Sequence, residues 1–137
     1  GAALARLGTF LADFNQPNKD ADDFNEIRYK RLQERPTMAS HVIGLAMQVG
    51  SNPKIPEIEE VAALSMAVQN MWLTAHALGL GAYWSTGSVA FSHELRNFMG
   101  FDEQHKAMGL FYLGKPALEN PVGRRLSSIE AKVRWED

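Results

Sequence analysis

The hydrophobic positions of the chain are densest between Ala62 and Gly87, where they follow a helical repeat. Apolar residues recur every three or four positions on one face of the predicted helix, and a second apolar row fills most of the opposite face. The first row is Val61, Leu64, Val68, Met71, Trp72, Ala75 and Leu78, and the second is Ala63, Met66, Ala67, Leu73 and Ala77. A helix that is apolar on nearly all sides needs neighbours on several sides. We therefore expect a long, buried central helix.

Sequence signals mark both ends of this helix. The segment Pro56–Glu60 places a proline and three acids at its start, where acids favour the positive end of the helix dipole. Gly79 and Gly81 supply the permissive backbone that ends it. The next residues, Ala82–Trp84, are typical of a short strand, and a loop follows through Gly87.

The other patterns are shorter and alternate between helix and strand. The predicted helices are Leu4–Phe14, Phe24–Leu32 and Phe91–Met99, and Pro36 is expected to stop the second of them. The predicted strands are His41–Val49, which is expected to be buried, and Met108–Leu113. A short extended segment is predicted at Val133–Trp135. Strands separated by helices predict an α+β or α/β fold with a sheet covered on both sides. We expect the α+β class, with residues 1–137 in one domain.

Composition narrows the class of protein. The chain of 137 residues is 45% apolar and 22% charged, as in ordinary globular domains. Its net charge of −2 and pI near 6.1 give no electrostatic reason to expect nucleic acid or an anionic membrane as a partner. The absence of cysteine fits a reducing compartment, and no apolar run reaches the roughly 20 residues of a membrane span. We expect a cytoplasmic protein without membrane contact.

The sequence contains no recognisable catalytic constellation. No Gly-x-Ser-x-Gly elbow is present, and no carboxylate pair stands on an apolar face. His41, His93 and His105 lack the spacing of a zinc or iron site. We assign no catalytic residue and no metal.

Three ordered motifs resemble the nitroreductase family of flavoproteins, particularly its small single-domain members. The first is the long helix, Gly-Leu-Gly, strand and Trp84-Ser85-Thr86-Gly87. The second is Lys106–Pro116, where an apolar strand ends in Tyr-Leu-Gly-x-Pro. The third is the tail, with the pair Arg124 and Arg125 before Ile129-Glu130 and Val133-Arg134-Trp135. Together they cover most of the chain.

The resemblance implies both a fold and an activity. The fold would be a central antiparallel or mixed sheet flanked by helices around the long helix, in a homodimer with flavin at the subunit interface. The activity would be that of an FMN-dependent oxidoreductase of ping-pong type. NAD(P)H would reduce the flavin and leave, and a small-molecule acceptor such as a nitroaromatic or a quinone would follow. The flavin would carry the redox chemistry, so no acid–base side chain is required.

The resemblance also implies site residues. Trp84, Ser85 and Thr86 would line the flavin ring, although the same residues also fit a strand end with a packing tryptophan. Arg124 and Arg125 would bind the FMN phosphate, or else form a solvated basic turn. The end of the central helix would border the nicotinamide pocket, with His76 either a proton donor or a structural residue. This last group is Thr74, Ala75, His76, Ala77, Leu78 and Gly79.

One family feature is missing from the sequence. Members normally begin with an Arg-Arg-Ser motif on a first helix, followed by a proline-rich segment, whereas this chain starts at Gly1-Ala-Ala-Leu. We therefore expect an N-terminally truncated form without the arginines of that motif. This leaves an alternative function: a truncated or degenerate, non-catalytic module of the same fold that serves flavin binding or dimerisation.

Overall fold

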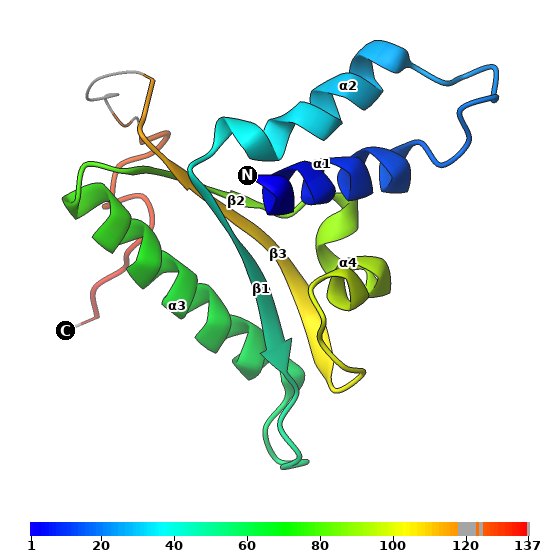
Figure 1. The fold of residues 1–137 in the computed structure, drawn as a ribbon. Coiled ribbons are helices and arrows are strands. Elements are labelled where there is room, and N and C mark those ends of the chain that lie inside the picture. Colours follow the sequence, from blue (N-terminus) through cyan, green and yellow to red (C-terminus); the bar gives the residue numbers. More distant parts are fainter. Residues whose placement is uncertain (118–122, 124, 137) are drawn as a thin grey trace.

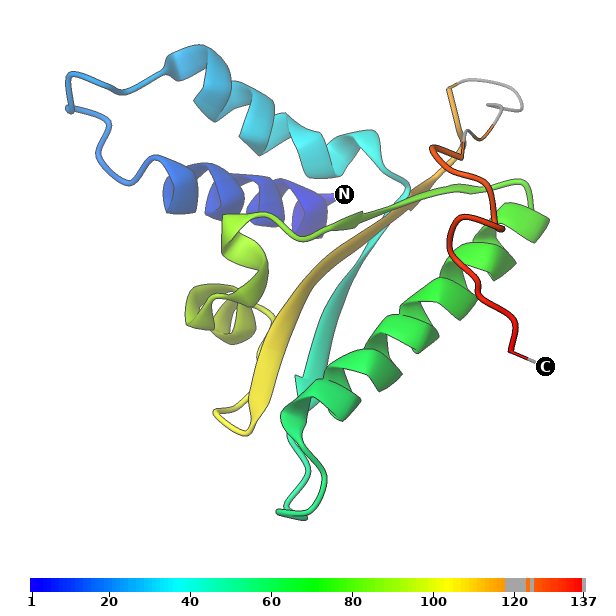
Figure 2. The same ribbon diagram turned by 180° about the vertical axis from the view of Figure 1, so that it is seen from behind.

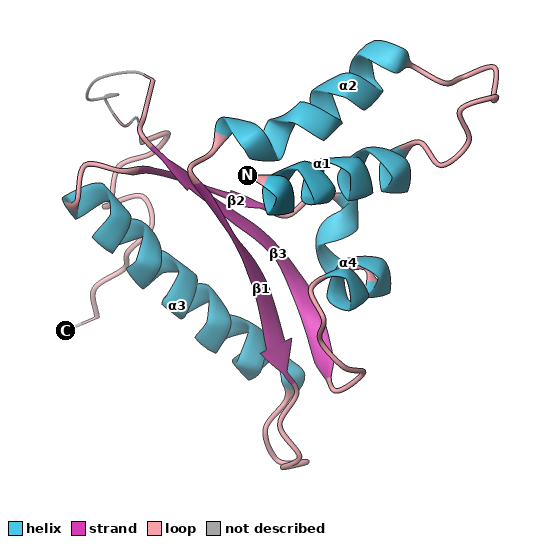
Figure 3. Cartoon of the chain, viewed as in Figure 1, coloured by secondary structure: helices cyan, strands magenta, loops and turns pink. Residues whose placement is uncertain are grey.

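The computed structural model describes residues 1–117, 123 and 125–136, and its core is a small antiparallel sheet with helices on both faces (Figure 1, Figure 3). The strands have the order β1-β3-β2, so β3 is central. Along the chain the elements are α1 (Ala2–Asn15), α2 (Glu26–Glu34), the 3-10 turn η1 (Arg35–Met38), β1 (His41–Gln48), α3 (Glu57–Ala77), β2 (Gly81–Ser85), the 3-10 turn η2 (Ser88–Phe91), α4 (His93–Phe98) and β3 (His105–Gly114).

The central strand divides the hydrophobic core into two layers. On one face, Leu110 packs with Leu7 of α1 and with Leu95 of α4. On the other face, Phe111 packs with Val68 of α3 and with Leu45 of β1. The two views in Figure 1 and Figure 2 show α3 alone on its face of the sheet, with α1, α2 and α4 on the opposite face.

The α+β class and most predicted elements are confirmed. The four predicted helices correspond to α1, α2, α3 and α4, with boundary differences of a few residues, and three predicted strands correspond to β1, β2 and β3. Pro36 lies in η1, directly after α2, as its effect on helix geometry predicts. The predicted extended segment at Val133–Trp135 forms no strand with other residues that the structure describes.

The prediction that α3 is buried on all sides is wrong for the single chain. Only Val68 and Ala75 of this helix are buried. Met66 is 63% exposed and Leu73 is 58% exposed. The physical reason is that the sheet covers one face of α3, while the second apolar row points away from it. The prediction that β1 is a buried strand is also wrong in part, because β1 is an edge strand in which only Leu45 and Met47 are buried.

A bulge interrupts the central strand. Leu45 of β1 lies opposite Gly109, whereas the next residue, Ala46, lies opposite Ala107, so Met108 is an extra residue in β3. The extra residue shifts the alternation of side chains along β3. Before Gly109, Ala107 faces the α1 side and Met108 the α3 side, and after it Leu110 faces the α1 side and Phe111 the α3 side. Gly109 has a φ of 103°, a backbone conformation that favours glycine.

We expect Gly109→Ala to destabilise the fold strongly. The new methyl group would overlap the carbonyl oxygen of Ser85 and would lie 3.1 Å from Nε1 of Trp84, in addition to the backbone strain. Urea denaturation should show a loss of at least roughly 2 kcal/mol in the free energy of unfolding. Gly87→Ala is the matched control, since Gly87 has a φ of −68° and open space around it. Equal stability of the two variants would contradict this account of the bulge.

Candidate functional site

The turn between α3 and β2 is fixed by a backbone motif. Gly79 has a φ of 74°, its amide donates to the carbonyl of His76, and the amide of Leu80 donates to the carbonyl of Ala75. This pair of hydrogen bonds is the Schellman arrangement that ends many helices. The chain therefore enters β2 at Gly81 in a defined direction.

The bulge of β3 holds the far end of β2. Nε1 of Trp84 donates a hydrogen bond of 2.9 Å to the carbonyl oxygen of Met108, the extra residue of the bulge. Ser85 pairs with Leu110, and its carbonyl lies against Gly109. The predicted Trp-Ser-Thr site is thus built on a rigid strand end.

The residues after this strand end are open to solvent. The side chain of Thr86 and the backbone of Gly87 are exposed. In the part of the chain that the structure describes, the amides of Thr86 and Gly87 donate no hydrogen bond outside the strand ladder. Exposed amides on a rigid support are donors that a polar ligand edge can use.

The two groups of predicted cofactor residues lie at opposite ends of β2. Thr74–Gly79 precedes the strand and Thr86 follows it, and five residues at about 3.3 Å each separate the groups by roughly 16 Å. Ala75 is buried, whereas His76 lines a cavity of about 430 Å³ with Trp72. A single chain therefore does not bring these groups into one pocket, and the nicotinamide role of Thr74–Gly79 stays a prediction.

The predicted phosphate-binding pair is described only in part. Arg124 lies outside the described residues. Arg125 is exposed in an irregular segment, and no ion pair joins it to another described residue. Its role as a phosphate ligand stays a prediction.

Sequence reasoning missed a cavity of about 480 Å³ beside the Trp-Ser-Thr strand end. β2 pairs only with the second half of β3, so the first half of β3 has an edge that no described strand covers. Apolar lining comes from Met47, Val61 and Met108, and polar lining from Arg96 and Lys106. The sequence does indicate that β2 is shorter than β3. Strand prediction alone, however, does not say which strands pair, so it could not predict that part of β3 has an uncovered edge.

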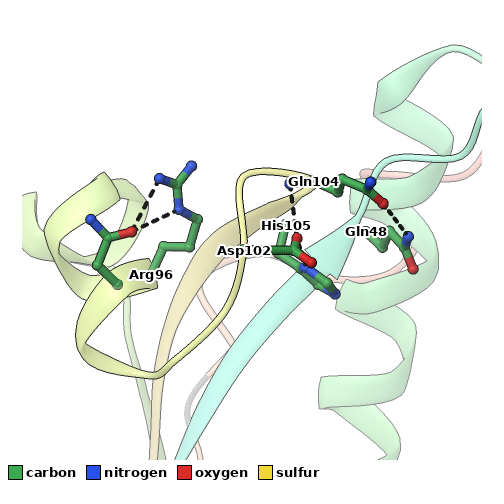
Figure 4. Close-up of polar contacts among 6 residues, drawn as sticks. Gln48, Arg96, Asp102, Gln104 and His105 are labelled. Atoms are coloured by element: carbon green, nitrogen blue, oxygen red, sulfur yellow. Dashed lines mark hydrogen bonds and ion pairs between the residues drawn. The ribbon is translucent and has the colours of Figure 1, made fainter.

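The charged side chains of this cavity have polar partners, and Figure 4 shows the contacts of Arg96 and His105. Lys106 Nζ lies 2.7 Å from both carboxylate oxygens of Glu57, and His105 Nδ1 lies 2.7 Å from Oδ1 of Asp102. The hydrogen bond with His105, and then that from the amide of Gln104, hold the pKa of Asp102 below its usual value. Arg96 donates to the side chain of Asn97. Among the described residues that line the cavity, Glu57 is the one carboxylate, and it is paired with Lys106.

Among residues 1–117, 123 and 125–136, no group of three or more His, Asp or Glu side chains is arranged to hold a metal ion. None of the helices described combines the length and the hydropathy needed to span a bilayer. The cytoplasmic location stays a prediction.

Comparison with known proteins identifies one family that the chain resembles. The model of the family described as "Nitroreductase family" matches residues 1–115. "Putative NAD(P)H nitroreductase YdjA" of Escherichia coli K12 is 32% identical over 89 residues, and the protein of the same name from strain O157:H7 matches equally. The match covers 65% of this chain and 49% of the relative, so the chain spans about half the length of the curated relatives it matches.

Solved structures support the same fold. The nitroreductase-like family protein from Bacillus cereus superposes with a TM-score of 0.70 at 21% identity, covering 97% of this chain and 66% of that one. NfrA1 of B. megaterium superposes with a TM-score of 0.56 at 15% identity, covering 93% of this chain and 63% of that one. At these identities the likeness concerns the fold alone.

Replacing Trp84 with phenylalanine tests the link between β2 and the bulge. The change removes the indole donor and leaves the carbonyl of Met108 without that partner, so the free energy of unfolding should fall by about 1–2 kcal/mol. Trp135→Phe is the control, because Trp135 is 88% exposed. Thermal and urea denaturation that gave the same stability for Trp84→Phe and the parent chain would argue against the link.

Proposed function

The chain belongs to the nitroreductase family, and we propose that it forms part of an FMN-dependent oxidoreductase. The reductant is NAD(P)H, and the acceptor is a small oxidised molecule such as a nitroaromatic or a quinone. Family membership over residues 1–115 and the printed name of the curated relative both support this activity class. This chain spans about half the length of its curated relatives. The proposed activity is therefore that of the whole protein.

The observation that carries the proposal is the exposed strand end at Trp84–Gly87. It offers the amides of Thr86 and Gly87 on a support fixed by the hydrogen bond from Trp84 to the bulge. A Cβ added at Gly87 would meet no atom within 4 Å, so a flat ring can approach the backbone there. When bound, the flavin supplies hydride and electron transfer, and these residues bind and orient its polar edge. Ser85, half-buried in the ladder, holds the position of this edge.

The phosphate end of the flavin is assigned to Arg124 and Arg125. A guanidinium group suits an oxyanion because it can donate parallel hydrogen bonds. The glycine at position 79 ends a helix and precedes a strand, which is the opposite order to a loop that binds a dinucleotide pyrophosphate. This polarity favours FMN over FAD.

A homodimer is proposed from the outer face of α3. The exposed apolar side chains Ile58, Met66 and Leu73 lie along this helix, with Trp72 at its margin. Their spacing places them on the side away from the sheet, where a second copy of the chain can bury them. A second copy would also bring another α3 toward the strand end, so that both chains could contribute to one cofactor slot.

One observation favours the alternative of a non-catalytic module. Within one chain, Thr74–Gly79 and Thr86 lie at opposite ends of β2, so the flavin slot has a wall on one side only. A protein that kept this half of the site would bind flavin weakly and serve as a binding or dimerisation module.

Thr86→Leu separates flavin binding from packing. If Thr86 borders the ring, added volume obstructs a flat cofactor, and flavin affinity should fall at least about tenfold, or roughly 1.4 kcal/mol. Stability of the flavin-free chain should change little, because Thr86 is exposed. Flavin fluorescence quenching measures the affinity, and Thr9→Leu, at an exposed threonine of α1, is the control. Equal affinities would remove Thr86 from the site; absence of flavin binding in both the parent chain and the variants would favour the non-catalytic module.

The homodimer is tested by sedimentation equilibrium. The parent chain at micromolar concentration should sediment at twice its mass of 15.2 kDa. Met66→Asp should shift the population to monomer, because a carboxylate in an apolar interface loses its hydration. Ile27→Asp on α2 is the control, since Ile27 is exposed to a similar degree but lies on the other side of the sheet. A parent chain found only as a 15.2 kDa species would contradict the homodimer.

A further inference from the structure

A third cavity lies on the face of the sheet opposite α3. Its volume is about 440 Å³, and it is formed by η1, by the start of β2 and by the end of β3. Tyr112, in its wall, belongs to the core layer that packs on α1. The cavity lies at the opposite end of β2 from Thr86 and has no part in the flavin-ring contacts proposed above.

Arg35 is held in this cavity by two aromatic rings. Its guanidinium carbon lies 5.4 Å from the ring centroid of Tyr83 and 5.7 Å from that of Tyr112. Cation–π attraction to both rings fixes the guanidinium plane. Among the described residues, no ion pair includes Arg35, so its N–H groups remain available to a ligand.

The other polar groups of the cavity are donors as well. Lys115 contributes a second positive charge, and none of the described residues that line the cavity carries a carboxylate. Burial raises the pKa of Tyr112, an effect larger than the opposing effect of Arg35, so the phenol stays protonated at neutral pH and can donate a hydrogen bond. The half-exposed phenol of Tyr83 is a further donor at the rim. Two cations and two phenols without a carboxylate make an environment for an anion.

We propose that this cavity binds the phosphate group of a small phosphate monoester, at a site separate from the flavin. A phosphate monoester carries a charge of about −2 at neutral pH, which offsets both cations, whereas a carboxylate offsets one. The guanidinium of Arg35 can donate to two phosphate oxygens at once. The organic part of the ester lies against the apolar wall, which includes Met38, Leu113 and Pro116.

The cavity suits a small molecule better than a polymer. Its volume lies within the usual range of ligand pockets, which is roughly 300–1,000 Å³. The net charge of the chain is −2, which gives no electrostatic reason to expect a nucleic acid backbone as the ligand.

The test is a calorimetric titration of the 137-residue chain with phenyl phosphate, with inorganic phosphate and benzoate as comparison ligands. Phenyl phosphate should bind saturably, and more tightly than either comparison ligand. Arg35→Gln should weaken binding at least about tenfold, and Lys115→Gln should weaken it less, because lysine lacks the bidentate geometry. Arg31→Gln, an exposed arginine of α2 with the same change in charge, should leave the affinity unchanged.

Two further variants and a competition make the outcome decisive. Arg35→Lys keeps the charge but loses the planar group. Its loss of binding free energy should therefore be more than half of the loss caused by Arg35→Gln. Phenyl phosphate should bind equally well with and without saturating riboflavin, which has the flavin ring but no phosphate group, and Thr86→Leu should not affect it. No saturable binding, or equal binding by Arg35→Gln, would overturn the proposal. Displacement of riboflavin by phenyl phosphate would also overturn it, because the cavity would then belong to the flavin-ring site; loss of flavin binding alone would leave it standing.

Discussion

The hydrogen bond from Trp84 to the bulge of β3 is the interaction on which the geometry of the proposed site depends. The extra residue Met108 turns its carbonyl toward the indole of Trp84, and Gly109 lets Ser85 approach closely. The same bulge sets which side chains of β3 face α1 and which face α3. Core packing and the position of the strand end therefore depend on the same few atoms, and the loop at Thr86 begins from a fixed point.

The long helix α3 links the fold to the proposed assembly. Val68 and Ala75 attach it to the sheet, and the exposed apolar row on its other side remains for a partner. This division explains why a sequence that is apolar all round gives a helix that is only half-covered in one chain. In the proposed homodimer, a site shared between two subunits would be incomplete in either subunit alone, which would account for the distance between the predicted cofactor groups.

Local signals in the sequence were sufficient to predict the helices and strands, but not their burial or their tertiary contacts. Helical periodicity located α3, the glycine at position 79 located its end, and the Trp-Ser-Thr-Gly motif located the strand end that the structure shows to be rigid. The burial of α3 was wrong because periodicity shows which faces are apolar and not which molecule covers them. The bulge depends on the register between β1 and β3, and the stacking of Arg35 joins residues of three separate elements. No pattern within a short window contains that information.

The central claim is that the amides of Thr86 and Gly87 receive the polar edge of a flavin. Site-resolved hydrogen–deuterium exchange with and without saturating FMN measures this directly, because an amide that donates to a bound ligand exchanges more slowly. The account predicts slower exchange at Thr86 and Gly87 when FMN is added, with the amides of α1 and α2 unchanged. Unchanged exchange at both residues, with protection by FMN elsewhere in the chain, would contradict it.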